Sequence, residues 1–489
     1  MSFIIGCDIG TTNVKTTAFD SDSAGILTSH SEGYEMLHPQ MDWSEQDPDE
    51  IYEAVCRSIQ KVCETCKPQG EPLGICFSSA MHSILCMAKN GKKLSNLIIW
   101  ADNRSADIAE KLKASADGKK MYQHNGTPIH AMTPSCKLIW LKKYQKDIFE
   151  KTDKFIGIKE YIIFRLTGQF VVDYSIASAT GLFNITEKKW DEWTLKKIGL
   201  NDSKLSKAVS PYHIEKLPQE NDFQVPAGTP LIMGASDGCL ANLGSGAILK
   251  GTMAITIGTS GAARICSDVP YLDETMRTFC YILDEDTYVV GGPSNNGAVV
   301  FEWMKNTFFP ESDYNEIFEV ASKIDAGADG LLFFPYLLGE RAPLWSSAVR
   351  GGFLGLDIQH SKSHFARAVM EGIHLNLYSI GKILLETQKV KRIFANGGFA
   401  QSQVWVQMLA DIFGTPVALN DTVDTGTVGA AMMGLKALDF VKDLSELDYF
   451  TPVSTIFEPH KEVHKQYLGV YKKFYASIEG VLINAGIDR

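Results

Sequence analysis

The sequence has no uninterrupted apolar run of about eighteen residues, the length that a membrane-spanning helix needs. It also has no long block of lysine and arginine, and its net charge is −11, so we expect neither a membrane nor a nucleic acid as a partner. The opening stretch "MSFIIGCDIG" lacks a basic leader and contains the acidic Asp8, which argues against a signal peptide. These absences predict a cytoplasmic protein that holds any anionic ligand with a few local cations.

Cysteine is present but not in a disulfide pattern, because the ten cysteines are scattered through 489 residues. Cys63 and Cys66 form one C-x-x-C motif, and no second pair has the spacing of a metal site. The motif is either a redox pair or chance placement near the end of a helix, and chance is the favoured interpretation. The sequence also lacks the G-x-x-x-x-G-K-[ST] loop of the Walker nucleotide-binding proteins, so any phosphate site must be built in another way.

What the sequence does contain is an alternation of apolar, β-branched runs with longer segments of helical period, which predicts an α/β fold. The length favours two large domains. We expect strands at "FIIGCDIG", "LGICFSS", "KRIFANGG" and "TPVALND", and helices over residues 49–66, 103–113, 363–386, 403–413 and 426–438.

One pattern occurs twice, because "CDIGTTNVKTTAFDSD" from Cys7 is similar to "ITIGTSGAARICSD" from Ile255. Each stretch predicts a strand, a Gly-Thr turn and a second strand. A similar hairpin at the start of each half suggests two related domains that meet near residues 243–252.

The first of these turns has the residue types of an anion site. Gly10 allows a sharp bend, and Thr11 and Thr12 offer hydroxyl and N–H groups to a phosphate. Asp8 can hold Mg²⁺ directly or through water. The alternative is a plain tight hairpin, but two such loops facing each other would grip a polyphosphate from both sides.

Polar residues and glycines also follow three other predicted strands, where ligands of α/β sheets gather. In "FSSAMHS", His82 can donate to a substrate oxygen or be an ordinary satisfied polar residue. In "IIWADNRSADIAEKL", we expect Asp102 to cap a helix and Arg104 to lie in its first turn, where a cation opposes the macrodipole and is a better candidate for a ligand contact. In "NGGFAQSQVW", Gly397 and Gly398 allow close approach of a flat ligand or a phosphate, or only close packing.

Asp237, in "LIMGASDGCLANLGSG", is a lone carboxylate, since no other residue between Asp222 and Lys250 carries a formal charge. It is either a general base that orients and deprotonates a hydroxyl, or a helix cap before "CLANLGSG".

In their order along the chain, the segments "DIGTT", "MTPSCKLIWLKK", "GASDG", "IGTSG", "GERAPLW", "GGFLGLDIQHSKSHFARAVMEG" and "NGGFAQSQVW" resemble the motifs of the FGGY carbohydrate kinases, members of the actin-like ATPase superfamily. The second signature of that family is matched throughout, and the first departs from it only at Tyr144. The resemblance implies two actin-like (ribonuclease H-like) domains, residues 1–245 and 246–489, an active site in the cleft between them, and the use of ATP and Mg²⁺.

The same resemblance implies a role for each candidate residue. Asp237 corresponds to the general base. Met81, His82 and Arg104 face the substrate, and His130 and Lys159 are the next candidates for a substrate-binding cation. The first phosphate loop includes Asp8, Thr11, Thr12 and Lys15, the second includes Thr259, and the adenosine site includes Gly397, Gly398 and Gln403.

Within the family, "FSSAMHS", "WADNRS" and "GTPIHAMTP" are most similar to bacterial gluconate kinases, which implies conversion of D-gluconate to 6-phospho-D-gluconate. The first alternative is a ketopentose such as xylulose, although Ala80 stands where xylulose kinases usually have Gln. The second is an actin-like ATPase that switches shape or assembles, which would not need the substrate-facing set. We also expect a homodimer.

Overall fold

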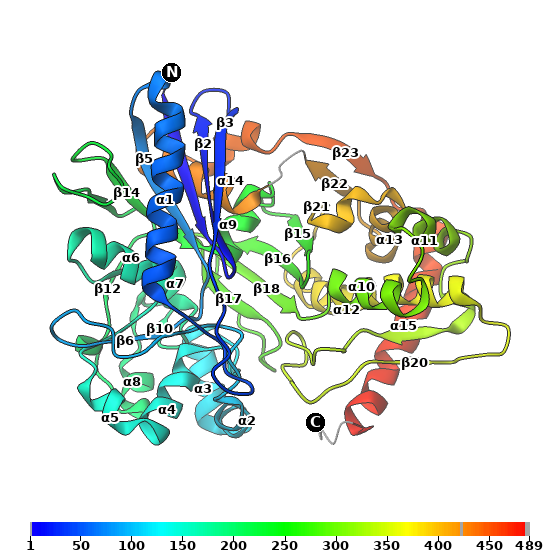
Figure 1. Ribbon diagram of the computed structural model, residues 1–489. Coiled ribbons are helices and arrows are strands. Elements are labelled where there is room, and N and C mark those ends of the chain that lie inside the picture. The colour runs from blue at the N-terminus through cyan, green and yellow to red at the C-terminus, as the bar shows by residue number, and fades with distance from the viewer. Residues whose placement is uncertain (1, 421–423, 485–489) are drawn as a thin grey trace. The chain divides into compact units, whose positions relative to one another are not determined.

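The computed structural model describes residues 2–420 and 424–484 and divides into two compact units (Figure 1). Unit one comprises Met1–Gly244, Ser267–Val289 and Thr422–Thr451, and unit two comprises Ser245–Cys266, Val290–Asp421 and Pro452–Arg489. The α/β fold predicted from the sequence is confirmed. The predicted assignment of residues 1–245 and 246–489 to two domains stays a prediction, and unit one additionally contains two segments from later in the chain.

Unit one is built on a six-stranded sheet of order β13-β14-β5-β1-β2-β3. β1 pairs antiparallel with β2 and parallel with β5, and β14 is parallel to β5. Because β1, β5 and β14 are parallel, their carboxyl ends lie at one edge of the sheet, which is where ligands of such sheets bind. The bounds are β1 Phe3–Ile9, β2 Asn13–Asp20, β3 Ile26–Gly33, β5 Pro72–Ser79, β13 Ile214–Lys216 and β14 Pro230–Ser236.

Alternation along β1 separates the two faces of this sheet. Ile5, Cys7 and Ile9 belong to one apolar core that includes residues of α1 (Pro48–Cys66). The intervening positions face α14 (Thr425–Ala437), since a Cβ on Gly6 would lie 2.1 Å from the Thr427 carbonyl oxygen. Only glycine permits this close approach.

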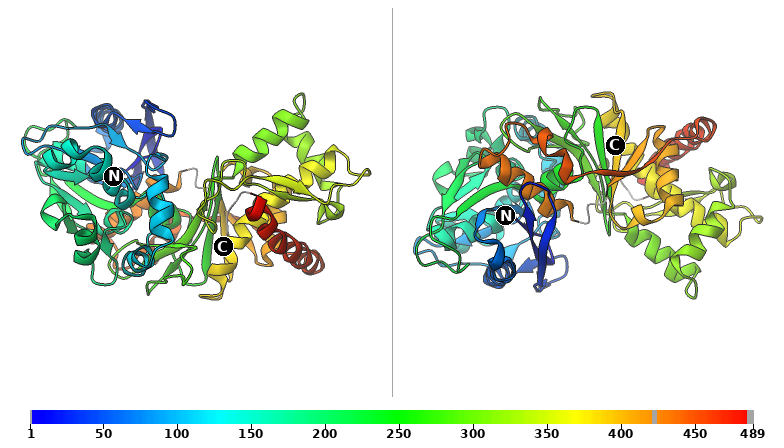
Figure 2. Two further views of the ribbon diagram at one scale, coloured as in Figure 1. Left: turned by 90° about the horizontal axis from the view of Figure 1, so that it is seen from below. Right: turned by 90° about the horizontal axis from the view of Figure 1, so that it is seen from above.

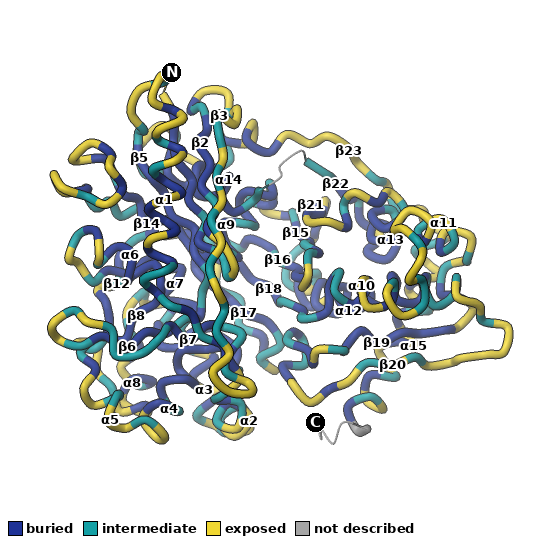
Figure 3. Tube along the Cα trace, viewed as in Figure 1, coloured by how far each residue is buried: buried dark blue, intermediate teal, exposed yellow. Residues whose placement is uncertain are grey.

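The two faces differ in which part of the chain covers them. α14, drawn in orange, lies against the dark blue N-terminal strands in Figure 1 and in both views of Figure 2, although it comes near the end of the chain. α9 (Asp237–Gly244) packs beside it. β1 is buried along nearly its whole length. Figure 3 shows that β5 is largely buried while the outer strand β3 is partly exposed.

Short helices and two-stranded ribbons follow the sheet strands of unit one. The ribbons are β4–β7 (Glu45–Gln46, Leu97–Ile98), β6–β8 (Leu85–Met87, Lys154–Ile156), β9–β12 (Val171–Asp173, Lys207–Val209) and β10–β11 (Phe183–Asn184, Lys189–Trp190). The helices are α2 Ala106–Lys113, α3 Ala116–Asn125, α4 Pro134–Tyr144, α5 Lys146–Lys151, α6 Ile158–Thr167, α7 Tyr174–Ser178 and α8 Glu192–Ile198.

The second large sheet has the order β17-β18-β16-β15-β21-β22-β23 and repeats the topology of the first. Its hairpin β15–β16 is antiparallel, β21 and β22 continue in parallel, and β23 closes the edge in antiparallel orientation. The bounds are β15 Thr252–Ile257, β16 Gly261–Ser267, β17 Phe279–Ile282, β18 Tyr288–Ser294, β21 Arg392–Asn396, β22 Val417–Asn420 and β23 Val453–Phe457. The remaining elements are β19 Leu332–Phe334, β20 Gly352–Leu354, α10 Ala298–Phe308, α11 Tyr314–Ser322, α12 Lys362–Leu385, α13 Gln403–Phe413 and α15 Lys461–Asn484.

Most sequence predictions of elements are confirmed. The four predicted strands correspond to β1, β5, β21 and β22, the repeated hairpin corresponds to β1–β2 and β15–β16, and four of the predicted helices begin and end within one residue of α1, α12, α13 and α14. The fifth prediction is wrong at its start: α2 begins at Ala106 with Ser105 as N-cap, so Arg104 precedes the helix and Asp102 does not cap it. The reason is that the Asp102 carboxylate is occupied by Arg104 and by the Ser44 N–H.

No helix among the described residues is long and apolar enough to cross a membrane. The C-x-x-C motif lies at the end of α1, and both of its cysteines are free thiols. Burial raises the pKa of Cys63 to about 12 and also raises that of Cys66, so neither is poised for redox exchange. The chance-placement interpretation is therefore the better one.

Candidate active site

The turn between β1 and β2 presents its N–H groups rather than its carbonyl groups. The carbonyl oxygen of Gly10 accepts from the Tyr34 hydroxyl at 2.5 Å, that of Thr11 accepts from Gln46 Nε2 at 2.6 Å, and that of Thr12 accepts from the Tyr34 N–H at 3.2 Å. In the described part of the chain, the N–H groups of Thr11 and Thr12 donate to no other residue. Successive unengaged N–H groups in a turn are what a concave anion site requires, so the geometry suits the prediction, which stays a prediction.

Asp8 lies one residue before the end of β1, on the face covered by α14. Ser78 Oγ donates to its Oδ1 at 2.5 Å. A Cβ on Gly426 would lie 2.5 Å from Asp8 Oδ2, so the first turn of α14 is in direct contact with this carboxylate. Asp424, the N-cap of α14, forms an ion pair with Lys15 Nζ at 3.0 Å.

The pKa of Asp8 is raised to about 7, mainly by burial and also by the negative charges of Asp424 and Asp237, while Ser78 and Lys15 oppose the rise. An ionised Asp8 therefore lies in a region where a cation is electrostatically favoured. Among the described residues, no group of three or more His, Cys, Asp or Glu side chains is placed to enclose a metal. Mg²⁺ in phosphate sites is usually held by one or two carboxylates together with phosphate oxygens and water, so Asp8 suits it.

Asp237 follows β14 directly and is the first residue of α9. Its partly exposed carboxylate accepts from the Gly238 N–H at 2.6 Å. That bond to the first turn of a helix is what the capping alternative expects. The negative charge of Asp237 also contributes to the raised pKa of Asp8, so the two carboxylates are close enough to interact. Its role as general base stays a prediction.

A buried lysine holds the strand that leads to Asp237. Lys159 Nζ donates to the carbonyl oxygens of Met233 and Ala235 at 2.9 Å each and pairs with Asp173 at 2.8 Å. Lys159 was an alternative candidate for binding the substrate, but its side chain is 1% exposed. Its contacts instead make it an anchor for the end of β14.

Met81 and His82 follow β5 at the same sheet edge. His82 is 8% exposed and has a positive φ of 69°. Its Nδ1 lies 2.7 Å from the Ala179 carbonyl oxygen, so the neutral ring carries its proton on Nδ1. Met81 lines a small cavity together with Thr11, Gln46 and Trp100.

Lys137, in the first family-like signature, connects three segments of unit one to one another. Its Nζ donates to the carbonyl oxygens of His82, Ile99 and Met132 at 2.7–2.8 Å. Burial lowers its pKa to about 7, and the nearby Asp102 opposes this effect. The backbone position of His82 therefore depends on an interior cation that sequence reasoning did not identify.

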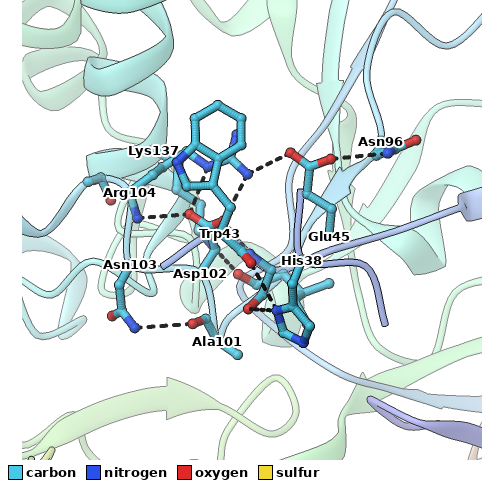
Figure 4. A network of polar contacts seen from close by, with 12 residues as sticks. His38, Trp43, Glu45, Asn96, Ala101, Asp102, Asn103, Arg104 and Lys137 are labelled. Atoms are coloured by element: carbon cyan, nitrogen blue, oxygen red, sulfur yellow. Dashed lines mark hydrogen bonds and ion pairs between the residues drawn. The ribbon is translucent and has the colours of Figure 1, made fainter. Parts of the chain in front are cut away.

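Arg104 is engaged within the protein (Figure 4). Its side chain is 2% exposed, and Nη2 lies 2.6 Å from Glu45 and 2.8 Å from Asp102. The guanidinium carbon lies 3.7 Å from the centroid of the Trp43 ring. Nη1 makes no hydrogen bond to another residue in the described ranges, so two of its five donors remain for a ligand. Its contact with substrate stays a prediction, as does that of His130, whose Nδ1 accepts from the Met132 N–H.

In unit two, the second loop and the glycine turn lie together. The N-terminus of α10 donates to the loop carbonyls, with Ala298 N–H to Gly258 at 2.7 Å and Gly297 N–H to Thr259 at 3.2 Å. Gly397 has φ 102°, and a Cβ there would lie 2.3 Å from the Ile257 carbonyl oxygen. Thr259, Gly397, Gly398 and Gln403 are all exposed. The candidate phosphate and adenosine residues of unit two are therefore neighbours.

Sequence reasoning missed several residues that shape these sites: Tyr34, Gln46, Ser78, Trp100, Lys137 and Asp424. Ser78 and Trp100 stand at strand ends, and Lys137 lies inside a quoted motif, so a signal existed for these three. Nothing local distinguishes Tyr34, Gln46 or Asp424, whose partners are distant in sequence.

Comparison with known proteins shows the same organisation. The model of the N-terminal domain of the FGGY family of carbohydrate kinases matches residues 3–244, and that of the C-terminal domain matches residues 253–438. The chain is 42% identical to a gluconokinase of Bacillus licheniformis, with 95% of this chain and 93% of that protein covered. It is 29% identical to a xylulose kinase of Staphylococcus epidermidis, with 96% of each covered. The crystal structure of gluconate kinase from Lactobacillus acidophilus has a TM-score of 0.95 at 36% identity and covers 98% of both chains.

Proposed function

The chain belongs to the FGGY family of carbohydrate kinases, and on that premise we propose that it transfers the γ-phosphate of ATP to the primary hydroxyl of D-gluconate. The observation that supports the choice of substrate is the 42% identity to a gluconokinase of Bacillus licheniformis, against 29% identity to a xylulose kinase of Staphylococcus epidermidis. The solved structures do not discriminate, because a gluconate kinase and a xylulose kinase from Lactobacillus acidophilus both match with a TM-score of 0.95 at 36% identity. The product is 6-phospho-D-gluconate.

In the proposed reaction, Asp237 orients the attacking hydroxyl and accepts its proton as the new bond to phosphorus forms. The N–H groups of Thr11 and Thr12 receive phosphate oxygens in unit one. In unit two, Thr259 meets the phosphates, and Gly397, Gly398 and Gln403 meet the adenosine. These groups are preorganised by the contacts described above, so they need little rearrangement when charge develops on the phosphoryl group.

Asp8 and, through its charge, Asp424 form the part of the site that suits Mg²⁺, with Lys15 as the local counter-charge. Mg²⁺ supplies neutralisation of the transferring phosphoryl group when bound with ATP. The chain's own contribution is to hold Asp8 through Ser78 and the first turn of α14.

The carboxylate of gluconate needs a cation, because a protein of net charge −11 does not attract an anion at long range. Arg104 is the proposed cation, through the two donors of Nη1. Glu45 and Asp102 hold the guanidinium in a fixed plane, which reduces the entropy lost when a substrate binds.

The proposal is tested by a coupled ADP-release assay with gluconate, xylulose, ribulose, glycerol and related sugar acids. ATP consumption that requires gluconate and exceeds that with each other acceptor is the expected result. Preference for xylulose would overturn the choice of substrate in favour of the ketopentose alternative. Sugar-independent ATP hydrolysis coupled to polymerisation would instead favour an actin-like switch.

The predicted homodimer and cytoplasmic location are part of this proposal. Size-exclusion chromatography with light scattering tests the homodimer.

A further inference from the structure

Two adjacent side chains of β4 connect the Arg104 cluster with the first phosphate loop. Glu45 accepts from Arg104 Nη2 at 2.6 Å, and Gln46 donates to the Thr11 carbonyl oxygen at 2.6 Å. Successive side chains of a strand point to opposite faces, so this two-residue strand contacts both groups at once. β4 is held in place by antiparallel pairing with β7, in the register Glu45–Ile98 and Gln46–Leu97.

The chain that leaves β7 makes a second contact with the same loop residue. Trp100 Nε1 lies 2.8 Å from Thr11 Oγ1. An indole N–H is only a donor, so the Thr11 hydroxyl must accept this bond, and its own proton points elsewhere. No other residue in the described ranges accepts a hydrogen bond from Thr11 Oγ1. The hydroxyl is therefore oriented as a donor without a partner inside the protein.

Both contacts converge on one place. Thr11, Gln46, Met81 and Trp100 line the same small cavity, and Trp100 and Met81 belong to segments that the sequence placed on the substrate side. The carbonyl of Thr11 is turned to Gln46 and its hydroxyl oxygen to Trp100. Its two donors, N–H and O–H, are left for a ligand.

We propose that Gln46 and Trp100 are positioning residues for nucleotide binding: they fix Thr11 so that its N–H and hydroxyl donate to a phosphate of ATP. This inference rests on the proposed use of ATP by the first loop. It does not depend on which sugar accepts the phosphate.

The test measures binding of ADP and of a non-hydrolysable ATP analogue, with Mg²⁺ and without sugar, by calorimetry on the full-length protein. Trp100→Phe keeps an aromatic ring but removes the donor, and we expect binding to weaken about tenfold, the worth of one hydrogen bond to a charged group. Gln46→Leu should weaken it to a similar extent. Trp190→Phe is the matched control, because it removes an indole bond of 2.9 Å, to the Ser206 carbonyl, that no candidate site residue shares.

A double-mutant comparison separates positioning from general damage to the fold. In a Thr11→Val background, where the hydroxyl is absent, Trp100→Phe should cause no further loss of nucleotide affinity. Thr11→Ser, which keeps the hydroxyl, should retain the sensitivity to Trp100→Phe. Unchanged affinity in both Trp100→Phe and Gln46→Leu, or losses from Trp100→Phe and Thr11→Val that simply add, would overturn the inference.

The outcome is distinguishable from failure of the proposed function. A wild-type protein that binds nucleotide with the expected sensitivities but does not phosphorylate gluconate would refute the substrate and leave this inference standing. If the wild-type protein phosphorylates gluconate but substitutions at Thr11, Gln46 and Trp100 leave nucleotide affinity unchanged, the proposed function stands and this inference is refuted.

Discussion

The two hairpin loops share a backbone plan but differ in how they are held and in charge. The β1–β2 loop of unit one has Asp8 and Lys15 beside it and is held by side chains from Tyr34, Gln46 and Trp100. The β15–β16 loop of unit two has no charged candidate and is held by backbone bonds from the start of α10. The comparison teaches that one repeated scaffold can carry different residue types: the charged candidate residues are in unit one, and the uncharged candidates for nucleotide binding are in unit two.

The largest effect that tests this comparison is expected from substitution of Asp237. Asp237→Asn keeps the size of the side chain but removes its basicity, so kcat should fall by about 10² to 10⁴ with ATP affinity and melting temperature near wild type. Steady-state kinetics and a thermal melt measure this. If Asp237 only caps α9, Asn caps about as well, and kcat would stay within a few-fold of wild type.

The next largest effect is expected at Arg104. Arg104→Leu should raise KM for gluconate by an amount equivalent to about 2–5 kcal/mol, and it should also lower stability because Glu45 and Asp102 lose their partner. Kinetics are measured at a temperature where the melt shows a folded protein, with KM for ATP as internal control. A folded variant with normal gluconate KM would leave Arg104 a structural residue and make His130 the next candidate.

Asp8 tests the charged side of the comparison directly. Asp8→Asn should weaken binding of Mg²⁺–nucleotide by about 10- to 100-fold, because an amide is a poor partner for Mg²⁺, and should leave gluconate binding nearly unchanged. Calorimetry with each ligand measures both. Equal losses for nucleotide and sugar would contradict the assignment of Asp8 to the metal side.

Thr259 tests the uncharged side. Thr259→Val should reduce ATP affinity about tenfold, comparable to loss of a single hydrogen bond to a charged group, with little change in stability because Thr259 is exposed. Nucleotide titrations compare it with Thr11→Val. A variant that binds ATP normally would show that the second loop makes no side-chain contact with the phosphates.

The smallest effect concerns stability against pH. Asp8 has a pKa raised from 3.8 to about 7, so the folded state holds a proton that the unfolded state has lost between these values. Stability contributed by this group is therefore present at low pH and is lost as pH rises towards 7. Relative to wild type without nucleotide, Asp8→Asn should gain stability between pH 4 and pH 8, as denaturant titrations at several pH values would show. An identical pH slope in both proteins would contradict the raised pKa.

The elements were predictable from sequence where periodicity is strong, as in α13, whose apolar residues repeat at helical spacing and whose end is marked by Gly414. The same reasoning failed at Arg104, because its environment comes from Glu45, on a strand of only two residues that no periodicity reveals. The sequence pattern predicted that Arg104 follows a strand end. Which of its donors remain available depends on tertiary contacts with Glu45 and Asp102, which the pattern does not reveal.

The candidate site was predictable to the extent that it lies in contiguous motifs. Asp8, Thr11 and Thr12 come together because they are neighbours in sequence, and Gly397 is near Thr259 because two adjacent parallel strands end there. The approach of Asp424 to Asp8 could not be predicted from the sequence, since it depends on the packing of α14 against β1, and these two elements are far apart along the chain. Gly6 offered a signal, because a glycine inside a strand often marks close approach of another backbone.

The packing of α14 against Gly6 has a consequence for folding during synthesis. The face of β1 and β5 that α14 covers is synthesised about 350 residues before α14, so at about 5–20 residues per second α14 follows roughly 20–70 seconds later. During that interval the part of the sheet that α14 later covers, which includes Ile4 and Cys76, lacks its cover, and chaperones at the ribosome exit can shield it. A gene fragment that stops after α9 would encode every strand of the first sheet and still yield an aggregation-prone product.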